Sequence, residues 1–264
     1  MSGLERIAEA FESARAEGRR AALMPYMMGG FPDLDASEAI GLAYAEAGAD
    51  LMELGVPFSD PLADGPVIHA AGTAALRAGA TLDGVLGLCR TIAPRLPTVV
   101  MCYANLIMAR GLERFVDALA GAGASGLIVP DLPFEEGERF LEACDTRGLA
   151  LVPLIAPITP PERLRLIGAR ARGFVYAVSL TGTTGERAAL DGGLEPVLAR
   201  AAASTEVPVA VGFGIGTPAQ AKAAADAGAD GVIVGTRLVR AANESDDPAA
   251  AVGELVAAFA TALK

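Results

Sequence analysis

Residues 46–55 read EAGADLMELG, and this short theme governs the interpretation of the whole chain. It starts with residues typical of a helix end, passes through a glycine, and continues as an apolar run that closes on an acid and a glycine. Two later stretches repeat the theme, GAGASGLIVPDLP at 121–133 and DAGADGVIVGT at 226–236. The repeat predicts a helix, a glycine stop and then a buried strand.

Five further apolar runs lack this prefix but also predict buried strands. They are RAALMPYMMGG at 20–30, LPTVVMCYAN at 96–105, GLALVPLIAP at 148–157, RGFVYAVSL at 172–180 and EVPVAVGFG at 206–214. Helical patterns separate these runs, around 35–47, 81–93, 111–121, 134–147, 160–170, 193–203, 217–227 and 248–263. The strands are continuously apolar, which is typical of a parallel sheet covered on both faces.

Eight strand–helix units in a chain of 264 residues predict a single (β/α)₈ barrel, the TIM barrel, over residues 1–264. An extra helix at the N-terminus and short extra helices in the loops after strands 2 and 8 complete this α/β fold. No linker-like stretch divides the chain, so one domain is expected. A doubly wound open sheet is the structural alternative.

Composition restricts the classes of function. The net charge of −11 argues against a nucleic-acid partner and against anionic membrane surfaces, because both attract basic proteins. Three scattered cysteines (Cys89, Cys102 and Cys144) do not form a disulfide framework and fit a reduced compartment. The N-terminal segment mixes both charges at a helical period, unlike a signal peptide. We expect a soluble, cytoplasmic protein.

In a (β/α)₈ barrel, the functional groups lie at the carboxyl ends of the strands. The stretch ELGVPFSDPLADGP, residues 53–66, places Glu53 at the end of strand 2 and Asp60 and Asp64 in the loop that follows. Burial at a strand end should raise the pKa of Glu53 and suit it to proton exchange near neutral pH. The prolines at 57 and 61 stiffen the loop. A Mg²⁺ site held by these acids is an alternative, and Asp60 can instead start a turn.

Glycine-rich loops follow three neighbouring strands, with TGTTG at 181–185, GFGIG at 212–216 and VGT at 234–236. Barrels often hold phosphate through the loops after strands 7 and 8 and an additional helix N-terminus. Helix starts at Thr217 and at Gly235–Thr236 would supply such N–H groups. We therefore predict a phosphate site there, against the alternative of ordinary turn glycines.

The inventory of side chains argues against several other chemistries. The only lysines are Lys222, within a helical pattern, and Lys264, the last residue, so an imine at a strand end is not expected. The only histidine is His69, which argues against a multi-histidine zinc site. Because imine and zinc chemistry are not expected, we predict acid–base catalysis by carboxylates.

The chain resembles the α subunit of tryptophan synthase from about Ala21 to Lys264. The resemblance is carried by ELGVPFSDPLADGP, YANLI, VPDLPFEE, TGTTG, GFGIGTPAQ and GADGVIVGT, in the order and spacing of that family. It implies a lyase of tryptophan biosynthesis that cleaves indole-3-glycerol phosphate to indole and glyceraldehyde 3-phosphate, without metal, imine or cofactor. Glu53 would exchange protons with the ring carbon and the side-chain hydroxyl. Asp64 would hold the indole N–H.

The resemblance also implies the rest of the site and a protein partner. The partner is a pyridoxal-phosphate β subunit in an α₂β₂ heterotetramer, and loops 2 and 6 would close over the substrate. The substrate would contact Tyr26, Tyr103, Ile155, Tyr176, Thr184 and Phe213. The phosphate would contact Gly185, Gly214, Gly235 and Thr236. The β subunit would contact or couple to Asp60, Pro61 and Asn105.

Some residues depart from the family pattern. Loop 1 reads YMMGGFPD, with Met28 and Phe31 where many members have a small hydroxyl residue and an acid, and Met101 and Cys102 alter strand 3. Two alternative functions remain open. One is another phosphate-binding barrel, such as a sugar-phosphate isomerase or an enzyme that forms indole-glycerol phosphate, although these typically need a strand-end lysine or histidine. The other is a barrel kept only to activate the β subunit.

Overall fold

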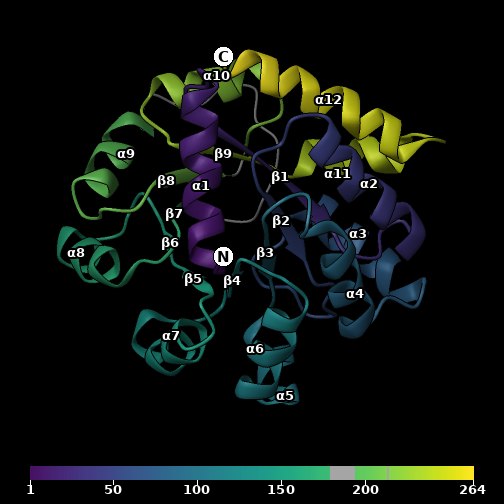
Figure 1. Cartoon of the computed structure of the whole chain (residues 1–264), viewed down its shortest axis with the longest axis horizontal. Coiled ribbons are helices and arrows are strands. Elements are labelled where there is room, and N and C mark those ends of the chain that lie inside the picture. The colour runs from purple at the N-terminus through teal and green to yellow at the C-terminus, as the bar shows by residue number, and fades with distance from the viewer. Residues whose placement is uncertain (179–193, 213) are drawn as a thin grey trace.

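The computed structural model describes residues 1–178, 194–212 and 214–264 (Figure 1). Its strands are all parallel and belong to one sheet, in the order β5-β4-β3-β2-β1-β9-β8-β7-β6. The strands are β1 Ala22–Met28, β2 Met52–Gly55, β3 Thr98–Met101, β4 Gly126–Ile128, β5 Ala150–Val152, β6 Leu154–Ile155, β7 Val175–Val178, β8 Val209–Gly212 and β9 Gly231–Val234.

The two strands at the ends of this order, β5 and β6, are consecutive halves of one segment interrupted at Pro153. The first half pairs with β4 and the second with β7. Pro153 has no N–H to donate, but its carbonyl accepts a hydrogen bond from the Tyr176 N–H at 2.9 Å. The single segment thus joins the two edges, and the sheet closes into the predicted (β/α)₈ barrel.

The helices follow the strands as the sequence predicts, and each of the eight expected helical ranges contains a helix. The helices are α1 Gly3–Ala16, α2 Leu34–Glu46, α3 Pro66–Arg77, α4 Leu82–Ile92, α5 Ala104–Arg110, α6 Leu112–Gly121, η1 Phe134–Glu136, α7 Glu138–Asp145, α8 Pro161–Arg170, α9 Leu194–Ala202, α10 Pro218–Asp226, α11 Thr236–Glu244 and α12 Pro248–Ala262. The expected extra helices are α1, α3 and α11, but α3 has 12 residues and is not short. The extra helix α5 after β3 was not expected.

Apolar side chains form two layers. The inner layer fills the barrel with residues on the strands, such as Met24, Val99 and Ile233, and with Leu51 just before β2. The outer layer lies between the strands and the ring of helices in Figure 1. Because both faces of each strand are buried, the strands are continuously apolar in sequence. The three cysteines are free and buried in this core.

Helix α1 crosses one end of the barrel (Figure 1). Its N-terminus carries a capping box, in which Ser2 and Glu5 exchange side-chain and backbone hydrogen bonds. Ile7 and Phe11 project from it into the inner apolar layer. A Cβ at Gly3 would lie 2.3 Å from the Ser125 carbonyl oxygen, so only glycine allows the helix to approach this closely.

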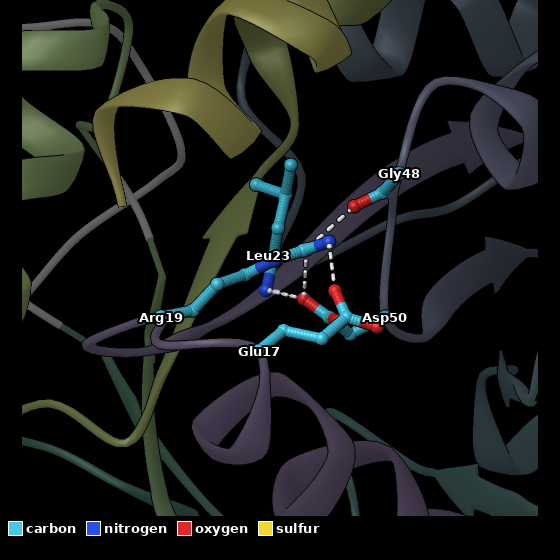
Figure 2. A network of polar contacts seen from close by, with 5 residues as sticks. All are labelled: Glu17, Arg19, Leu23, Gly48 and Asp50. Carbon is cyan, nitrogen blue, oxygen red and sulfur yellow. Dashed lines mark hydrogen bonds and ion pairs between the residues drawn. The ribbon is translucent and has the colours of Figure 1, made fainter. Parts of the chain in front are cut away.

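A buried ion pair joins the segment after α1 to the start of β2 (Figure 2). The Arg19 Nη1 donates to Asp50 Oδ2 at 2.7 Å and to the Gly48 carbonyl at 2.6 Å. Asp50 also accepts from the Leu23 N–H at 2.7 Å. Both charged side chains are only 8% exposed. Burial raises the pKa of Asp50 to about 6, and the bonds from Leu23 and Arg19 work against that increase.

Replacing Arg19 with methionine is expected to lower the free energy of unfolding by about 3 kcal/mol at pH 7.5, because Asp50 is left buried without its counter-charge. The raised pKa of Asp50 means that its contribution to stability is lost as pH rises through about 6. The loss should therefore be smaller at pH 5, where Asp50 is protonated. Urea unfolding at the two pH values measures both effects.

The matched control is Arg172→Met, because Arg172 pairs with Asp145 at 3.2 Å on the surface. Exposed pairs contribute little, so this change should cost less than about 1 kcal/mol at either pH. Equal losses in the two variants would contradict a special role for the buried pair.

No helix in the described ranges is long and apolar enough to cross a lipid bilayer.

Candidate active site

A cavity opens at the carboxyl ends of the strands, where the barrel rule places function. Its walls come from strand ends and from the loops that follow them, so residues far apart in sequence meet there. The lining residues are Tyr26, Glu53, Ala63, Asp64, Ile68, Met101, Pro130, Leu154, Tyr176, Gly214, Ile215, Ile233, Gly235 and Thr236. Seven of these are predicted site residues: Tyr26, Glu53, Asp64, Tyr176, Gly214, Gly235 and Thr236.

Glu53 projects into this cavity from the end of β2. Its side chain is 2% exposed, and neither carboxyl oxygen has a hydrogen-bond partner among the described residues. Burial raises the pKa of Glu53 to about 8, and the negative charge of Asp64 contributes to the increase. A buried, unpaired acid is costly to folding. At neutral pH Glu53 is protonated, and its pKa suits both the release and the recovery of a proton.

Asp64 reaches the same cavity from the loop between β2 and α3. The Tyr103 hydroxyl donates to Asp64 Oδ1 at 3.0 Å and accepts from the Ala63 N–H at 3.0 Å. Burial raises the pKa of Asp64, while the Tyr103 hydrogen bond and the charge of His69 oppose that increase. The Tyr103 ring also packs against Phe58 of the loop, with ring centroids 5.3 Å apart. Tyr103 therefore braces the loop and fixes the direction of the Asp64 carboxyl.

Two tyrosines extend across glycines on neighbouring strands. Tyr26 lies beside Glu53 in the register of β1 and β2, and a Cβ on Gly55 would lie 2.3 Å from the Tyr26 hydroxyl. Tyr176 lies in the same way against Gly212. Burial raises the pKa of both phenols, with negative charge from Asp64 and Glu53 adding to the effect at Tyr26 and from Glu53 at Tyr176. Both hydroxyls stay protonated and can donate hydrogen bonds.

The structure distinguishes the two helix starts that the sequence suggested for phosphate. At α10 the Thr217 capping box uses the Gln220 side chain to accept from the N–H groups of Gly216 and Thr217, so these groups are already paired. Helix α11 starts directly after β9 with Gly235 as its N-cap and no side-chain cap. Gly235 and Thr236 line the cavity together with Gly214. An anion in the cavity would meet the α11 N-terminus.

Some predicted residues do not reach the cavity. Ile155 lies in the apolar layer outside the strands, and its neighbour Leu154 lines the cavity in its place, because successive strand residues point to opposite faces. Tyr103 acts through Asp64 and is absent from the cavity wall. Thr184, Gly185 and Phe213 lie outside the described residues. Sequence reasoning missed Ile68, Ile215 and Ile233, which carry no chemical signal beyond apolarity.

The three predicted partner-facing residues lie away from the catalytic cavity. Asp60 is exposed and hydrogen-bonded to Ser59. Pro61 is half-buried beside it, and Asn105 is exposed on α5. Of the three acids in residues 53–66, only Glu53 and Asp64 reach the cavity. Within the described ranges, no three acidic, cysteine or histidine side chains are grouped as metal ligands.

The unusual residues of loop 1 are buried. Met28 packs against Gly72 of α3, where a Cβ would lie 3.3 Å from the methionine methyl group. The Phe31 carbonyl accepts a hydrogen bond from the Ser37 hydroxyl at 3.0 Å, which ties the loop to α2. Gly30 has a φ of 80° and faces Ala80, so loop 1 fits closely against the turn before α4. Loop 1 is thus held by apolar packing and by the hydrogen bond from Ser37.

Comparison with known proteins gives a consistent result. The family model described as tryptophan synthase alpha chain matches residues 11–264. The tryptophan synthase alpha chain of Synechococcus elongatus is 47% identical over 240 residues, which cover 90% of each chain. That of Gloeobacter violaceus is 48% identical over 237 residues, covering 89% of this chain and 86% of the relative.

The similar solved structures also come from tryptophan synthases. A chain of Mycobacterium tuberculosis tryptophan synthase superposes with a TM-score of 0.91 at 39% identity, covering 98% of both chains. The tryptophan synthase alpha chain of Legionella pneumophila superposes with a TM-score of 0.88 at 32% identity, covering all of this chain and 97% of the other. Together with the barrel fold and the two acids in its cavity, these matches show that the chain belongs to the tryptophan synthase alpha chain family.

Proposed function

We propose that this chain cleaves indole-3-glycerol phosphate to indole and glyceraldehyde 3-phosphate, with Glu53 and Asp64 as its catalytic residues. The lyase reaction belongs to tryptophan biosynthesis and is the reaction of the family. The observation that carries the residue assignment is the unpaired, buried carboxyl of Glu53 in the same cavity as Asp64. The whole chain acts as one domain, since α12 near its end packs against α2 near its start.

Glu53 performs the proton transfers. Its protonated carboxyl delivers a proton to C3 of the indole ring, which leaves positive charge on the ring nitrogen. The resulting carboxylate takes the proton from the hydroxyl on the adjacent side-chain carbon. The bond between that carbon and C3 then breaks, its electrons restore the aromatic ring, and the side chain leaves as an aldehyde. Glu53 delivers one proton and takes up one proton, so its carboxyl group ends in the form in which it started. The electrons of the broken bond stay in the indole ring, so the reaction as written needs no cofactor or metal.

Asp64 stabilises the charge that develops on the ring nitrogen. Its carboxylate accepts a hydrogen bond from the indole N–H. The electrostatic attraction between the carboxylate and the ring strengthens as the ring becomes cationic. The Tyr103 hydrogen bond holds the carboxyl in one direction at 3.0 Å. Rigid placement matters because a catalytic group that must reorganise during the reaction loses much of its effect.

The phosphate and the indole ring of the substrate are each bound by a separate part of the cavity. The phosphate lies at the N-terminus of α11, where Gly235 and Thr236 face the cavity beside Gly214. Gly185, Thr184 and Phe213 remain predicted contacts. Apolar side chains around the acids hold the indole ring and lower the local dielectric constant, which strengthens both charge effects. These side chains include Met101, Leu154, Ile215 and Ile233.

The protein works with a pyridoxal-phosphate β subunit, in an α₂β₂ assembly. Asp60, Pro61 and Asn105 are the contact or coupling residues of the α chain. Two large apolar side chains on the same loop and helix are exposed, Leu62 by 79% and Met108 by 55%, which fits a surface covered by a partner. We place the complex in the cytoplasm, supported by three buried cysteines without disulfide bonds.

Indole release from indole-3-glycerol phosphate tests both the activity and the partnership. The isolated chain should release indole slowly, and a saturating cognate β subunit should accelerate single-turnover cleavage by ordering the loops around the cavity. Unchanged single-turnover rates would contradict the coupling. A chain without any activity, alone or in the complex, would support the alternative of a barrel kept only to activate the β subunit.

A further inference from the structure

A second pocket, with a volume of about 250 Å³, lies beside the fifth strand segment, between η1 and α7 on one side and α8 on the other. Its walls are mainly apolar and include Leu132, Leu141, Leu151 and Ile167. Of the described residues assigned to the reaction, only Leu154 also lines it, and none of those assigned to the β subunit does. The proposed function places no part of the substrate in this pocket.

Two arginines of α8 stand at this pocket around one aromatic ring. The guanidinium carbon of Arg170 lies 4.9 Å from the centroid of the Phe134 ring, and that of Arg163 lies 6.0 Å from it. Arg163 is already paired with Glu135 through two parallel hydrogen bonds of 2.8 and 2.9 Å. In the described part of the chain, the Arg170 guanidinium has no carboxylate partner.

The position of Arg170 over the Phe134 ring determines what this side chain can bind. The cation–π contact with Phe134 at 4.9 Å takes up no oxygen acceptor, so the N–H donors of the Arg170 guanidinium can still pair with a carboxylate. These donors match the two oxygens of a carboxylate in a bidentate pair. The apolar walls beside them suit a hydrocarbon body. The required ligand thus combines one carboxylate with a compact apolar group.

The size of the pocket limits that apolar group. An apolar cavity of about 150 Å³ accommodates benzene, and pockets for drug-sized ligands start near 300 Å³. A volume of about 250 Å³ therefore fits a body of one or two rings. A nucleotide is too large, and a phosphate group would be expected to need more than one unpaired cation.

We propose that this pocket binds a small carboxylic acid with a flat apolar body, whose carboxylate pairs with Arg170. This inference does not depend on the catalytic assignment, because binding can be measured without substrate. Pro130 and Leu154 line both this pocket and the catalytic cavity, so the two sites share a wall. A test must accordingly show that the acid occupies the Arg170 side of that wall.

Benzoate is the probe, with benzyl alcohol as its neutral counterpart of the same size. Calorimetric titration of the full chain should show saturable benzoate binding, roughly millimolar for so few atoms, and much weaker binding of benzyl alcohol. Arg170→Ala should weaken benzoate at least tenfold. Arg165→Ala is the matched control, since Arg165 is exposed on the same helix but does not line the pocket, and it should leave binding unchanged.

A second variant keeps the result interpretable. Phe134→Ala removes the stacking surface while keeping Arg170, and should also weaken benzoate. Circular dichroism and the unfolding midpoint show whether each variant folds, and Arg170→Lys, which keeps the charge without the bidentate geometry, replaces Arg170→Ala if the latter does not. Three results would overturn the proposal: no saturable binding of benzoate, equal binding of benzyl alcohol, or benzoate binding that is unaffected by the change at Arg170.

Discussion

Replacing Glu53 with glutamine is expected to reduce indole release by roughly 10²–10⁴-fold, the usual cost of losing a positioned proton-transfer group. Glutamine has nearly the same shape but cannot donate and then recover a proton. The substrate should still bind, since the phosphate and ring contacts are untouched. Steady-state kinetics with indole-3-glycerol phosphate should therefore show a large fall in kcat and a small change in KM.

Unfolding measurements provide the control for this variant. The pKa of Glu53 is raised to about 8, so in the wild type its contribution to stability is lost as pH rises through 8. The glutamine variant lacks this ionisation and should lose less stability between pH 6 and pH 9. Low activity in a protein that has become more resistant to alkaline unfolding would assign the loss to chemistry. Retention of near wild-type kcat would refute the role of Glu53 in proton transfer.

Asp64→Asn is expected to lower kcat/KM by about 10²-fold, because the amide cannot balance the positive charge on the ring nitrogen. It should also change the pH profile. The negative charge of Asp64 helps raise the pKa of Glu53, so removing it lowers that pKa. Since the protonated form of Glu53 starts the reaction, the alkaline limb of kcat/KM should move to lower pH.

The direction of this movement separates an electrostatic role from a structural one. A change that only loosened the loop would lower the rate at every pH without moving the limb. Asp83→Asn is a suitable control, because Asp83 is an exposed acid on α4 that pairs with Arg110 away from the cavity. Its pH profile should match that of the wild type. A limb that stays in place or moves to higher pH in Asp64→Asn would contradict the coupling of the two acids.

Much of this architecture is predictable because the sequence signals are local. The repeated glycine stop locates three of the strands, and the barrel rule reduces 32 acids to a few at strand ends, including Glu53, Asp60 and Asp64. The family resemblance then separates Glu53 and Asp64 from Asp60. The extra helix α5 was missed because its seven residues directly follow the apolar run of β3 and show no separate amphipathic pattern. The length of α3 was underestimated because its helical signals were attributed to the loop.

Side-chain direction was harder to predict than position. In a strand buried on both faces, apolar residues occupy inward and outward positions alike, so nothing in ALVPLI indicates that Leu154 faces the cavity and Ile155 faces the helices. The bracing of Asp64 by Tyr103 was missed for a similar reason. It depends on how a loop folds back over β3, which spacing along the chain does not encode.

The helix that crosses the far end of the barrel bears on how the catalytic cavity is reached. Ile7 and Phe11 of α1 fill the inner layer beneath the strands, and the contact of Gly3 with Ser125 leaves no room for a side chain. Helix α1 packs across this end, whereas the catalytic cavity opens at the carboxyl ends of the strands, so reactant is expected to enter and product to leave there. We expect the β subunit to contact the same end of the barrel through the loop that carries Asp60 and Pro61. A hydrophobic product that leaves by this mouth of the barrel is expected to emerge beside the β subunit.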